Sequence, residues 1–318
     1  KDALKTNTTA SNNTAVGKEA LTANTTGAAN TASGYGALHD NTTGASNVAI
    51  GHEAMQNNTT ASFNVAIGVD ALYTNTTGAE NVAVGAGALD ANTTASNNTA
   101  VGGQNALGAN TTGAQNTAIG GGALAANTTA SNSTSVGHAS LIRNTTGASN
   151  VAVGVDALNF NTTGANNTAV GSYCLDANTT AANNVAVGYG ALTANTTGAE
   201  NTAMGTLALG ANTTASNNTA VGRAALAANT TGEQNTAVGS AAGDAVTTGR
   251  NVSAFGFNAL TAVTTGANNT GLGVGAGQTI ASGSDNIAVG YLADCAHDSA
   301  NSITIGVGIT GQGDYFKF

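Results

Sequence analysis

The chain has no proline and no tryptophan, and it is poor in aromatic and charged residues. Of its 318 residues, 4% are aromatic and 7% are charged, whereas about 25% of the residues in a typical soluble domain are charged. Few bulky side chains are therefore available to fill the wide core of a globular domain. A disordered chain combines low hydrophobicity with high net charge, and the scarcity of charge disfavours that class as well.

Basic residues are the scarcest of the charged types: 7 Lys and Arg stand against 16 Asp and Glu, and the formal net charge is −9. No basic patch is available to neutralise phosphates, so we expect no nucleic-acid partner. No apolar run approaches the about 18 residues of a membrane span, so no membrane insertion is expected in this part of the chain. The sequence begins inside a repeat with Lys1 rather than Met, and we interpret it as a fragment of a longer fibrous protein.

One short repeat runs through the whole sequence. The string Asn-Thr/Val-Ala-Val/Ile-Gly recurs with a step of 17 residues, apart from single steps of 18 and 16, and gives about eighteen copies. Each copy continues through Ala-Leu and Asn-Thr-Thr before the next one begins. Such self-similarity is typical of repeat architectures. Since no room is left for a second domain, residues 1–318 are expected to form a single continuous repeat array.

The repeat unit predicts an all-β, parallel β-solenoid. Helical repeats need more than about 30 residues. The five-residue segments are rich in Val, Ile and Thr and are bounded by Gly or Asn, as strands are. Stacking them in register gives a solenoid in which each coil hydrogen-bonds to the next. The lack of proline fits, because an interior strand needs every backbone N–H. We expect about eighteen coils of 17 residues.

Alternation of side chains along the strand assigns a core and an interface. We expect the Val or Ile that precedes the Gly to point into the coil and to meet the Leu row there. The predicted core residues are Val16, Ile50, Val101, Val153, Val187, Leu21, Leu107, Leu158 and Leu192. The Ala before each Val or Ile points the other way, and a row so small and apolar is expected to pack against another chain. The predicted interface residues are Ala15, Ala49, Ala83, Ala100, Ala152 and Ala186.

An exposed stripe of alanines along the array would be an aggregation hazard on a monomer. Closed cyclic symmetry buries such a stripe without leaving a free copy, whereas an open head-to-tail contact would polymerise. We therefore expect a parallel homotrimer with the Ala row at its axis.

The Asn-Thr-Thr strings are interpreted as turns. Asn tolerates the left-handed conformation and closes turns, and Thr stacks well in ladders. The representative turn and ladder residues are Asn24, Asn92, Asn127, Asn161 and Asn195. Each string is also formally an N-glycosylation sequon, and the sequence leaves open whether any of them carries sugar.

No constellation of residues indicates an enzyme, a cofactor or a metal site. His52 and His138 occupy the same turn position five coils apart, which at about 4.8 Å per coil is about 24 Å, too far for one metal ion. Both are interpreted as exposed turn residues. Cys174 and Cys295 lie seven coils apart and cannot form an intrachain disulfide. We interpret Cys174 as a small buried side chain.

Two further patterns bear on surface binding. Tyr35, Tyr189, Phe257 and Tyr291 share one turn position, where they either contact a glycan or receptor or are scattered surface residues. Stacked Thr rows are typical of solenoid antifreeze proteins, so an ice-binding solenoid is an alternative of another class. The adjacent pair Thr93–Thr94 weighs against it, because neighbours on a strand point to opposite faces.

The repeat resembles those of two groups of fibrous proteins. Asn-Val-Ala-Ile-Gly at 47–51 and 64–68 is similar to the head repeat of trimeric autotransporter adhesins of the YadA type. The longer unit, Asn-Asn-Thr-Ala-Val-Gly-x-x-Ala-Leu-x-x-Asn-Thr-Thr-Gly, is more similar to repeats of phage tail fibres. The resemblance covers nearly the whole chain. It implies a left-handed parallel β-roll that trimerises and is displayed outside a cell or virion, although the coil is longer here than in the YadA heads.

From the repeat and the resemblance we expect a non-enzymatic structural and adhesive fibre shaft, part of a phage tail fibre used in host attachment. The alternative is the head of a bacterial surface adhesin of the trimeric autotransporter type. The expected partners are further copies of the same chain, in a parallel homotrimer, and a host-surface glycan or receptor. The expected location is the virion tail fibre or an extracellular surface.

Overall fold

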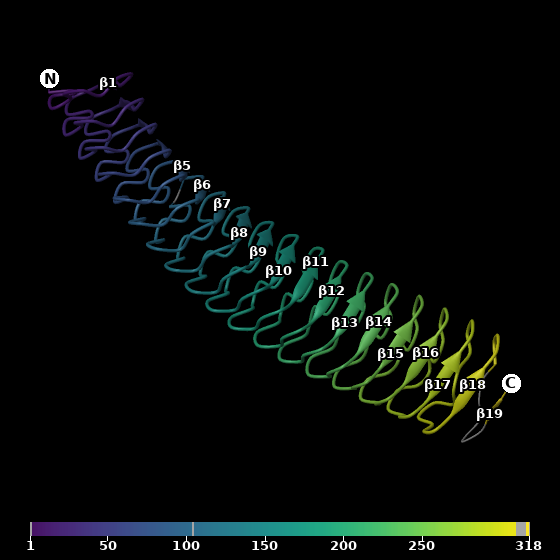
Figure 1. Ribbon diagram of the computed structural model, residues 1–318. Coiled ribbons are helices and arrows are strands. Elements are labelled where there is room, and N and C mark those ends of the chain that lie inside the picture. The colour runs from purple at the N-terminus through teal and green to yellow at the C-terminus, as the bar shows by residue number, and fades with distance from the viewer. Residues whose placement is uncertain (1, 104, 310–315, 318) are drawn as a thin grey trace. The chain divides into compact units, whose positions relative to one another are not determined.

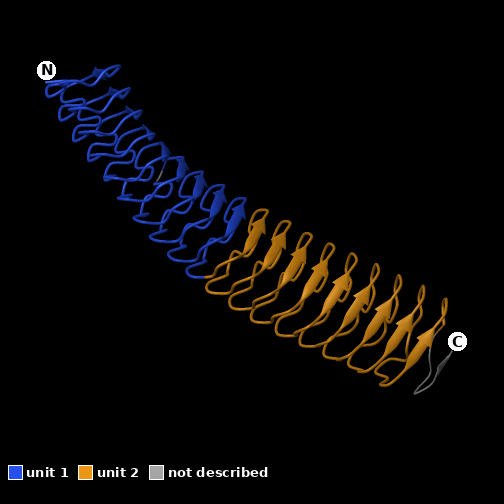
Figure 2. Ribbon diagram, viewed as in Figure 1, with its two compact units in different colours: residues 1–163 blue, residues 164–318 orange. Residues whose placement is uncertain are grey.

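The computed structural model describes residues 2–103, 105–309 and 316–317. The chain forms two compact units, Lys1–Thr163 (unit 1) and Gly164–Phe318 (unit 2), which Figure 2 colours separately. Both units consist of short strands joined by turns, and the described residues form no helix (Figure 1).

Each repeat contributes one short strand. Unit 1 contains β1 (Thr14–Val16), β2 (Thr31–Ser33), β3 (Val48–Ile50), β4 (Val65–Ile67), β5 (Val82–Val84), β6 (Thr99–Val101), β7 (Thr117–Ile119), β8 (Thr134–Val136) and β9 (Val151–Val153). Unit 2 contains β10 (Thr168–Val170), β11 (Val185–Val187), β12 (Thr202–Met204), β13 (Thr219–Val221), β14 (Thr236–Val238), β15 (Ser253–Phe255), β16 (Thr270–Leu272), β17 (Ile287–Val289), β18 (Ile303–Ile305) and β19 (Phe316–Lys317).

Within each unit, successive strands pair in parallel and in register. In β3 and β4, for example, Val48 pairs with Val65 and Ile50 with Ile67. The strands define about 17 coils, so the prediction of an all-β, parallel β-solenoid is confirmed. Whether the two units form the single continuous array predicted for residues 1–318 stays a prediction.

The strands are shorter than the five-residue segments that the sequence suggested, because the first and last residues of each segment do not take part in the strand ladder. The residue in front of the strand, Asn in most repeats, donates its backbone N–H to a side chain of the preceding coil, as Asn47 does to Oδ1 of Asn30 at 3.0 Å. The Gly behind each strand has left the extended conformation: φ of Gly17 is 129°. A Cβ at Gly17 would collide with the carbonyl oxygen of Gly34 in the next coil. Three residues of each repeat are therefore left as strand.

The core of each coil lies between the central strand residue and the Leu of the following turn. The predicted core residues of the Leu row are all 0% exposed, namely Leu21, Leu107, Leu158 and Leu192. This part of the prediction is confirmed. The Leu residues adopt a left-handed backbone conformation, with φ of 51° at Leu21. That conformation costs roughly 1–2 kcal/mol, and burial of the side chain, worth about 1.5–3 kcal/mol, offsets it.

The prediction that the Ala row forms an oligomer interface is wrong. Its members Ala49, Ala83, Ala100, Ala152 and Ala186 are 0% exposed in the single chain. They face the interior of their own coil. Ala15 occupies the same strand position in the first coil, where it is half-buried.

The prediction that the Val or Ile row lies in the core is also wrong. Val16 is 61% exposed and Ile50 is 41% exposed, while Val101, Val153 and Val187 are half-buried. In a three-residue strand the first and third side chains share one face and the second occupies the other. The second residue faces the Leu row, so the first and third face outward.

The physical reason for the reversal is the narrowness of the coil. Gly271 takes the Ala position in β16, and a Cβ there would stand 2.7 Å from Cγ of Leu260. In this coil the Leu side chain thus fills the space that a methyl group would take, and in the other coils a methyl group already fills it, as at Ala83 and Ala100. A Val or Ile in that position would overpack the interior, whereas Ala fits.

Two ladders of asparagine fill the rest of the interior. The first, which we call the turn Asn ladder, consists of the Asn of each Asn-Thr-Thr string. Nδ2 of Asn41 donates to Oδ1 of Asn24 at 2.8 Å and to the carbonyl of Gly44 at 2.9 Å. The predicted turn and ladder residues Asn24, Asn92, Asn127, Asn161 and Asn195 are all 0% exposed, so their role as a turn ladder is confirmed.

The second ladder, which we call the strand Asn ladder, consists of the Asn that directly precedes most of the strands. Nδ2 of Asn47 donates to the carbonyl of Ala61 at 2.9 Å, in the same turn where Asn58 donates to that carbonyl. Each such turn carbonyl therefore accepts from both ladders. Buried polar groups are tolerated when they are hydrogen-bonded, and this is how a coil with few large apolar side chains obtains a filled interior.

Candidate functional site

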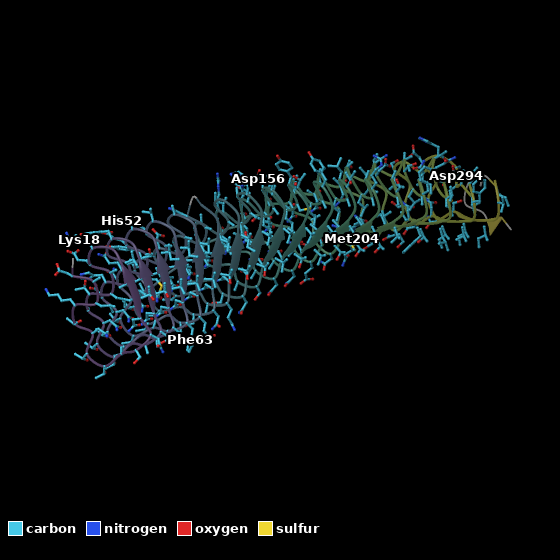
Figure 3. The ribbon with its side chains drawn as sticks, turned by 90° about the horizontal axis from the view of Figure 1, so that it is seen from above. Lys18, His52, Phe63, Asp156, Met204 and Asp294 are labelled. Atoms are coloured by element: carbon cyan, nitrogen blue, oxygen red, sulfur yellow. The ribbon has the colours of Figure 1, made fainter. Side chains whose placement is uncertain are left out.

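The most extensive surface feature is the outer face of the strands, which we call the sheet face. It consists of the first and third residues of β1–β18. The first position holds Thr, Val, Ser or Ile, and the third holds Val, Ile or another apolar residue except for Ser33. None of these residues is charged. Met204 marks this face in Figure 3 and is 44% exposed.

The sheet face repeats itself from coil to coil. In-register pairing places like residues above one another, such as Ile50 above Ile67 and Thr202 above Thr219. Neighbouring parallel strands lie about 4.8 Å apart. The result in each unit is a regular, uncharged surface of β-branched side chains. Chemically it offers shape and apolar contact.

The two Thr of each Asn-Thr-Thr string have different surroundings. Oγ1 of Thr25 donates to the carbonyl of Thr42 in the next coil at 3.0 Å, so this hydroxyl belongs to the stacking of the coils. Thr26, Thr94 and Thr146 stand in the second row and are exposed. The second row is therefore the more exposed of the two, and the first is half-buried.

The fold buries the asparagine of the Asn-Thr-Thr sequons, as Asn24 shows. Nδ2 of Asn24, the atom to which a glycan would be attached, donates to Oδ1 of Asn7 and to the carbonyl of Gly27, both at 2.9 Å. The whole side chain is 0% exposed. A glycan on this nitrogen would replace one of the two N–H groups that make these bonds and would collide with the neighbouring coil, so a folded coil does not present the asparagine for modification.

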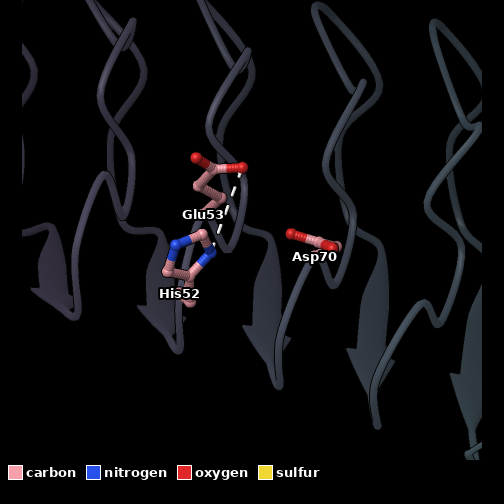
Figure 4. A group of neighbouring side chains, drawn as sticks. All are labelled: His52, Glu53 and Asp70. Carbon is pink, nitrogen blue, oxygen red and sulfur yellow. Dashed lines mark ion pairs between the residues drawn. The ribbon is translucent and has the colours of Figure 1, made fainter.

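We call the row of turns that directly follow the strands the turn edge. In unit 1 it carries a cluster of chemically different side chains, in the turns after β3 and β4. His52, Glu53 and Asp70 come from two successive coils, and one ligand-type atom from each lies within 4.8 Å of the other two (Figure 4). Nδ1 of His52 is 4.0 Å from Oε2 of Glu53. The backbone holds them in place: Glu53 N donates to the carbonyl of Tyr35 at 2.8 Å, and Asp70 N to that of His52 at 3.0 Å.

A hollow of about 150 Å³ adjoins this cluster and is lined by Glu53, Asp70, Tyr73 and Asp90. Burial raises the pKa of the Asp90 carboxyl, and the negative charge of Asp70 adds to that increase. Three carboxylates therefore share a small region with one imidazole.

Sequence analysis missed this cluster because it compared histidines only with each other. The signal was the 17-residue spacing of Glu53 and Asp70, which places both at the same turn position of adjacent coils. His52 and His138 are exposed, as predicted. The prediction of no metal site rested on their separation alone and did not consider carboxylates from the next coil.

The remaining candidates behave as the sequence indicated. Cys174 and Cys295 are both buried and free, and burial raises the pKa of both thiols. The aromatic residues of the shared turn position are exposed, namely Tyr35, Tyr189, Phe257 and Tyr291. Tyr173 and Tyr189 form an edge-to-face pair with ring centroids 5.8 Å apart.

Comparison with known proteins assigns this chain to no family. No protein-family model matches the chain, and no curated protein matches it. Across the part of the chain that the structure describes, no helix has the length and apolar character needed to cross a membrane.

Proposed function

We propose that this chain is the shaft of an adhesive fibre, part of a phage tail fibre used in host attachment, and that it assembles as a parallel homotrimer through the sheet face. The observation that carries the proposal is the uncharged, β-branched outer face of β1–β18. The resemblance of the repeat to tail fibres and trimeric adhesins supplies the number of copies, the left-handed β-roll and the extracellular or virion location. The head of a bacterial surface adhesin is the alternative with the same fold.

The sheet face favours another copy of this chain as its partner. An apolar partner must present matching ridges at the strand spacing of about 4.8 Å along the length of a unit. A parallel copy in the same register does so at every coil, because like residues stack in every pair of strands, as Val48 and Val65 do. A globular partner with irregular side chains would match only a few coils.

The area of the face suits a specific interface. A three-residue strand is about 10 Å long, and nine such strands at about 4.8 Å cover roughly 400 Å² in each unit. Each unit taken by itself thus offers about half of the about 800 Å² per partner that stable interfaces bury. Closed cyclic symmetry would bury all copies of the face and leave none free to polymerise. The reason for expecting a closed assembly, given above for the Ala row, therefore applies equally to the sheet face.

The adhesive part of the proposal rests on the turn edge. Tyr189, Phe257 and Tyr291 are more than half exposed, and an assembly through the sheet face leaves these turns at the outside. Their aromatic rings, two of which carry a hydroxyl group, suit contact with a glycan or a receptor.

Assembly through the sheet face is tested by charge substitution and mass in solution. Ile119→Lys combined with Val153→Lys places like charges in the proposed interface. The matched control, Thr94→Lys with Thr146→Lys, places the same charges in the exposed Thr row. We expect wild type and control at three times the 30.4 kDa of one chain, and the sheet-face variant at one chain mass. A monomeric wild type, or equal masses for both variants, would contradict the proposal.

One observation favours ice binding as a second candidate. Thr99 and Val101 share the outward face of β6, so strands that begin with Thr present Thr together with an apolar residue, which the Asn-Thr-Thr strings do not. The same face cannot serve both functions at once. Thermal hysteresis from a monomeric wild-type chain would favour ice binding, and a trimer without thermal hysteresis would favour the fibre shaft.

A further inference from the structure

We propose that the turn edge of unit 1 carries a binding site for a divalent transition-metal ion, with His52, Glu53 and Asp70 as its protein ligands. The three ligand atoms lie within 4.8 Å of one another. Ligands about 2.0–2.2 Å from a zinc ion are roughly 3–4 Å apart from each other. Small rotations of the exposed His52 and the half-buried Glu53 and Asp70 side chains therefore bring the three groups to coordinating distances without moving the backbone.

The backbone positions of the ligands are set by the solenoid itself. Glu53 and Asp70 occupy the same turn position in successive coils, with φ of 54° and 56°. Their N–H groups are hydrogen-bonded to the preceding coils, and His52 stacks on Tyr35 with ring centroids 5.2 Å apart. Pre-positioned ligands lower the ordering cost of binding.

The charge around the cluster is uncompensated by protein cations. No ion pair with Lys or Arg is formed by Glu53, Asp70 or Asp90 among the residues that the structure describes. Lys18 instead contacts Glu19 at 3.4 Å and lies over the ring of Tyr35. A bound cation would neutralise the negative charge that the carboxylates place on each other.

The donor set points to the class of metal. One imidazole with two carboxylates suits zinc or manganese, whereas calcium and magnesium prefer oxygen ligands alone. The hollow beside the cluster, lined in part by Tyr73 and Asp90, gives room for water molecules that would complete the coordination. The imidazole distinguishes this cluster from an ordinary acidic surface patch.

The chain contains its own comparison site. His138, Ala139 and Asp156 occupy the same three positions five coils later, with φ of 55° at Ala139. Asp156 N donates to the carbonyl of His138 at 3.1 Å, as Asp70 N does to His52. This site lacks only the Glu, and its Asp156 accepts a hydrogen bond from Asn159 at 2.8 Å.

Titration of the full chain with ZnCl₂ by calorimetry tests the inference. We expect one site per chain whose affinity falls at least tenfold in His52→Gln and in Asp70→Asn. Asp156→Asn, the matched control, should bind as the wild type does. No zinc binding by the wild type, or binding unaffected by both ligand variants, would overturn the inference. CaCl₂ binding as tight as ZnCl₂ binding and unaffected by His52→Gln would overturn it too, because the site would then be an acidic patch only.

A gain of binding provides an independent test. Ala139→Glu together with Asn159→Ala completes the second set of ligands and frees Asp156 to take part. The account expects this variant to bind a second equivalent of zinc with an affinity within about tenfold of the first. A stoichiometry that stays at one would contradict the claim that these three positions suffice to bind the metal.

Discussion

The end of the turn Asn ladder makes a sharp test of how the interior of the coil is stabilised. Oδ1 of Asn229 is the one buried side-chain polar atom without a hydrogen-bond partner among the described residues. The reason is visible in the next coil, where Val246 takes the place of the Asn that would donate to it. The ladder thus ends on an unpaired acceptor.

Replacing an interior member of the ladder by Val should create a second unpaired acceptor. Asn212 donates to Oδ1 of Asn195 at 2.8 Å and to the carbonyl of Ala215 at 3.0 Å. In Asn212→Val the first acceptor loses its partner, while the carbonyl of Ala215 still accepts from Asn201. An unpaired buried acceptor costs about 1–3 kcal/mol.

Asn229→Val is the matched control, because it only moves the end of the ladder. It removes the unpaired Oδ1 of Asn229 and leaves that of Asn212 unpaired in its place. The carbonyl of Gly232 keeps its bond from Asn218. The number of unpaired acceptors is unchanged, and Val already occupies this position at Val246 and Val263.

Asn212→Val should therefore be less stable than Asn229→Val by about 1–3 kcal/mol. Hydrogen exchange of the amides in residues 195–232 is the suitable assay, because coils contact only their neighbours and unfolding need not be two-state. Equal protection of these amides in the two variants would refute the reasoning.

Three further predictions concern the core and one carboxyl. Leu192→Ala should cost about 2–5 kcal/mol, measured as faster hydrogen exchange confined to its own and adjacent coils. Ala100→Leu should destabilise by about 1–3 kcal/mol through overpacking, against less than about 0.5 kcal/mol for Thr94→Leu in the exposed row; equal denaturation midpoints would contradict the face assignment. Because burial raises the pKa of Asp90, ionisation of this carboxyl lowers the stability of the folded chain, and the loss develops as the pH rises through the pKa of the folded state. Asp90→Asn should stabilise the chain at neutral pH, and thermal melts should show that gain shrinking toward the ordinary Asp value of 3.8; a gain that grows on acidification would contradict the cause.

The solenoid could be predicted from the sequence because a 17-residue period is too short for helical repeats and its Val and Thr segments favour strands. The Leu row was assigned correctly for a simple reason: no other position of the turn holds a large apolar residue so regularly. The turn role of Asn24 and its equivalents followed from the conformational preferences of Asn.

The direction of the strand faces could not be predicted by the same reasoning. Alternation shows that Ala100 and Val101 point to opposite sides, but not which side is inside. The larger side chain was expected in the core, and the width of the coil decided otherwise. That width depends on the two Asn ladders, whose side chains occupy space that an apolar core would otherwise fill. The His52 cluster escaped notice because its members are neighbours only once successive coils are stacked.

The central claim is that parallel copies of the chain meet through the sheet face, and cysteine cross-linking at Val101 tests it most directly. In Val101→Cys, a parallel assembly in register brings the same residue of different copies together. Mild oxidation should then give a covalent dimer of twice 30.4 kDa in denaturing electrophoresis under non-reducing conditions. Thr94→Cys, on the exposed Thr row, should give none. Cross-linking through position 94 but not through position 101 would contradict the account.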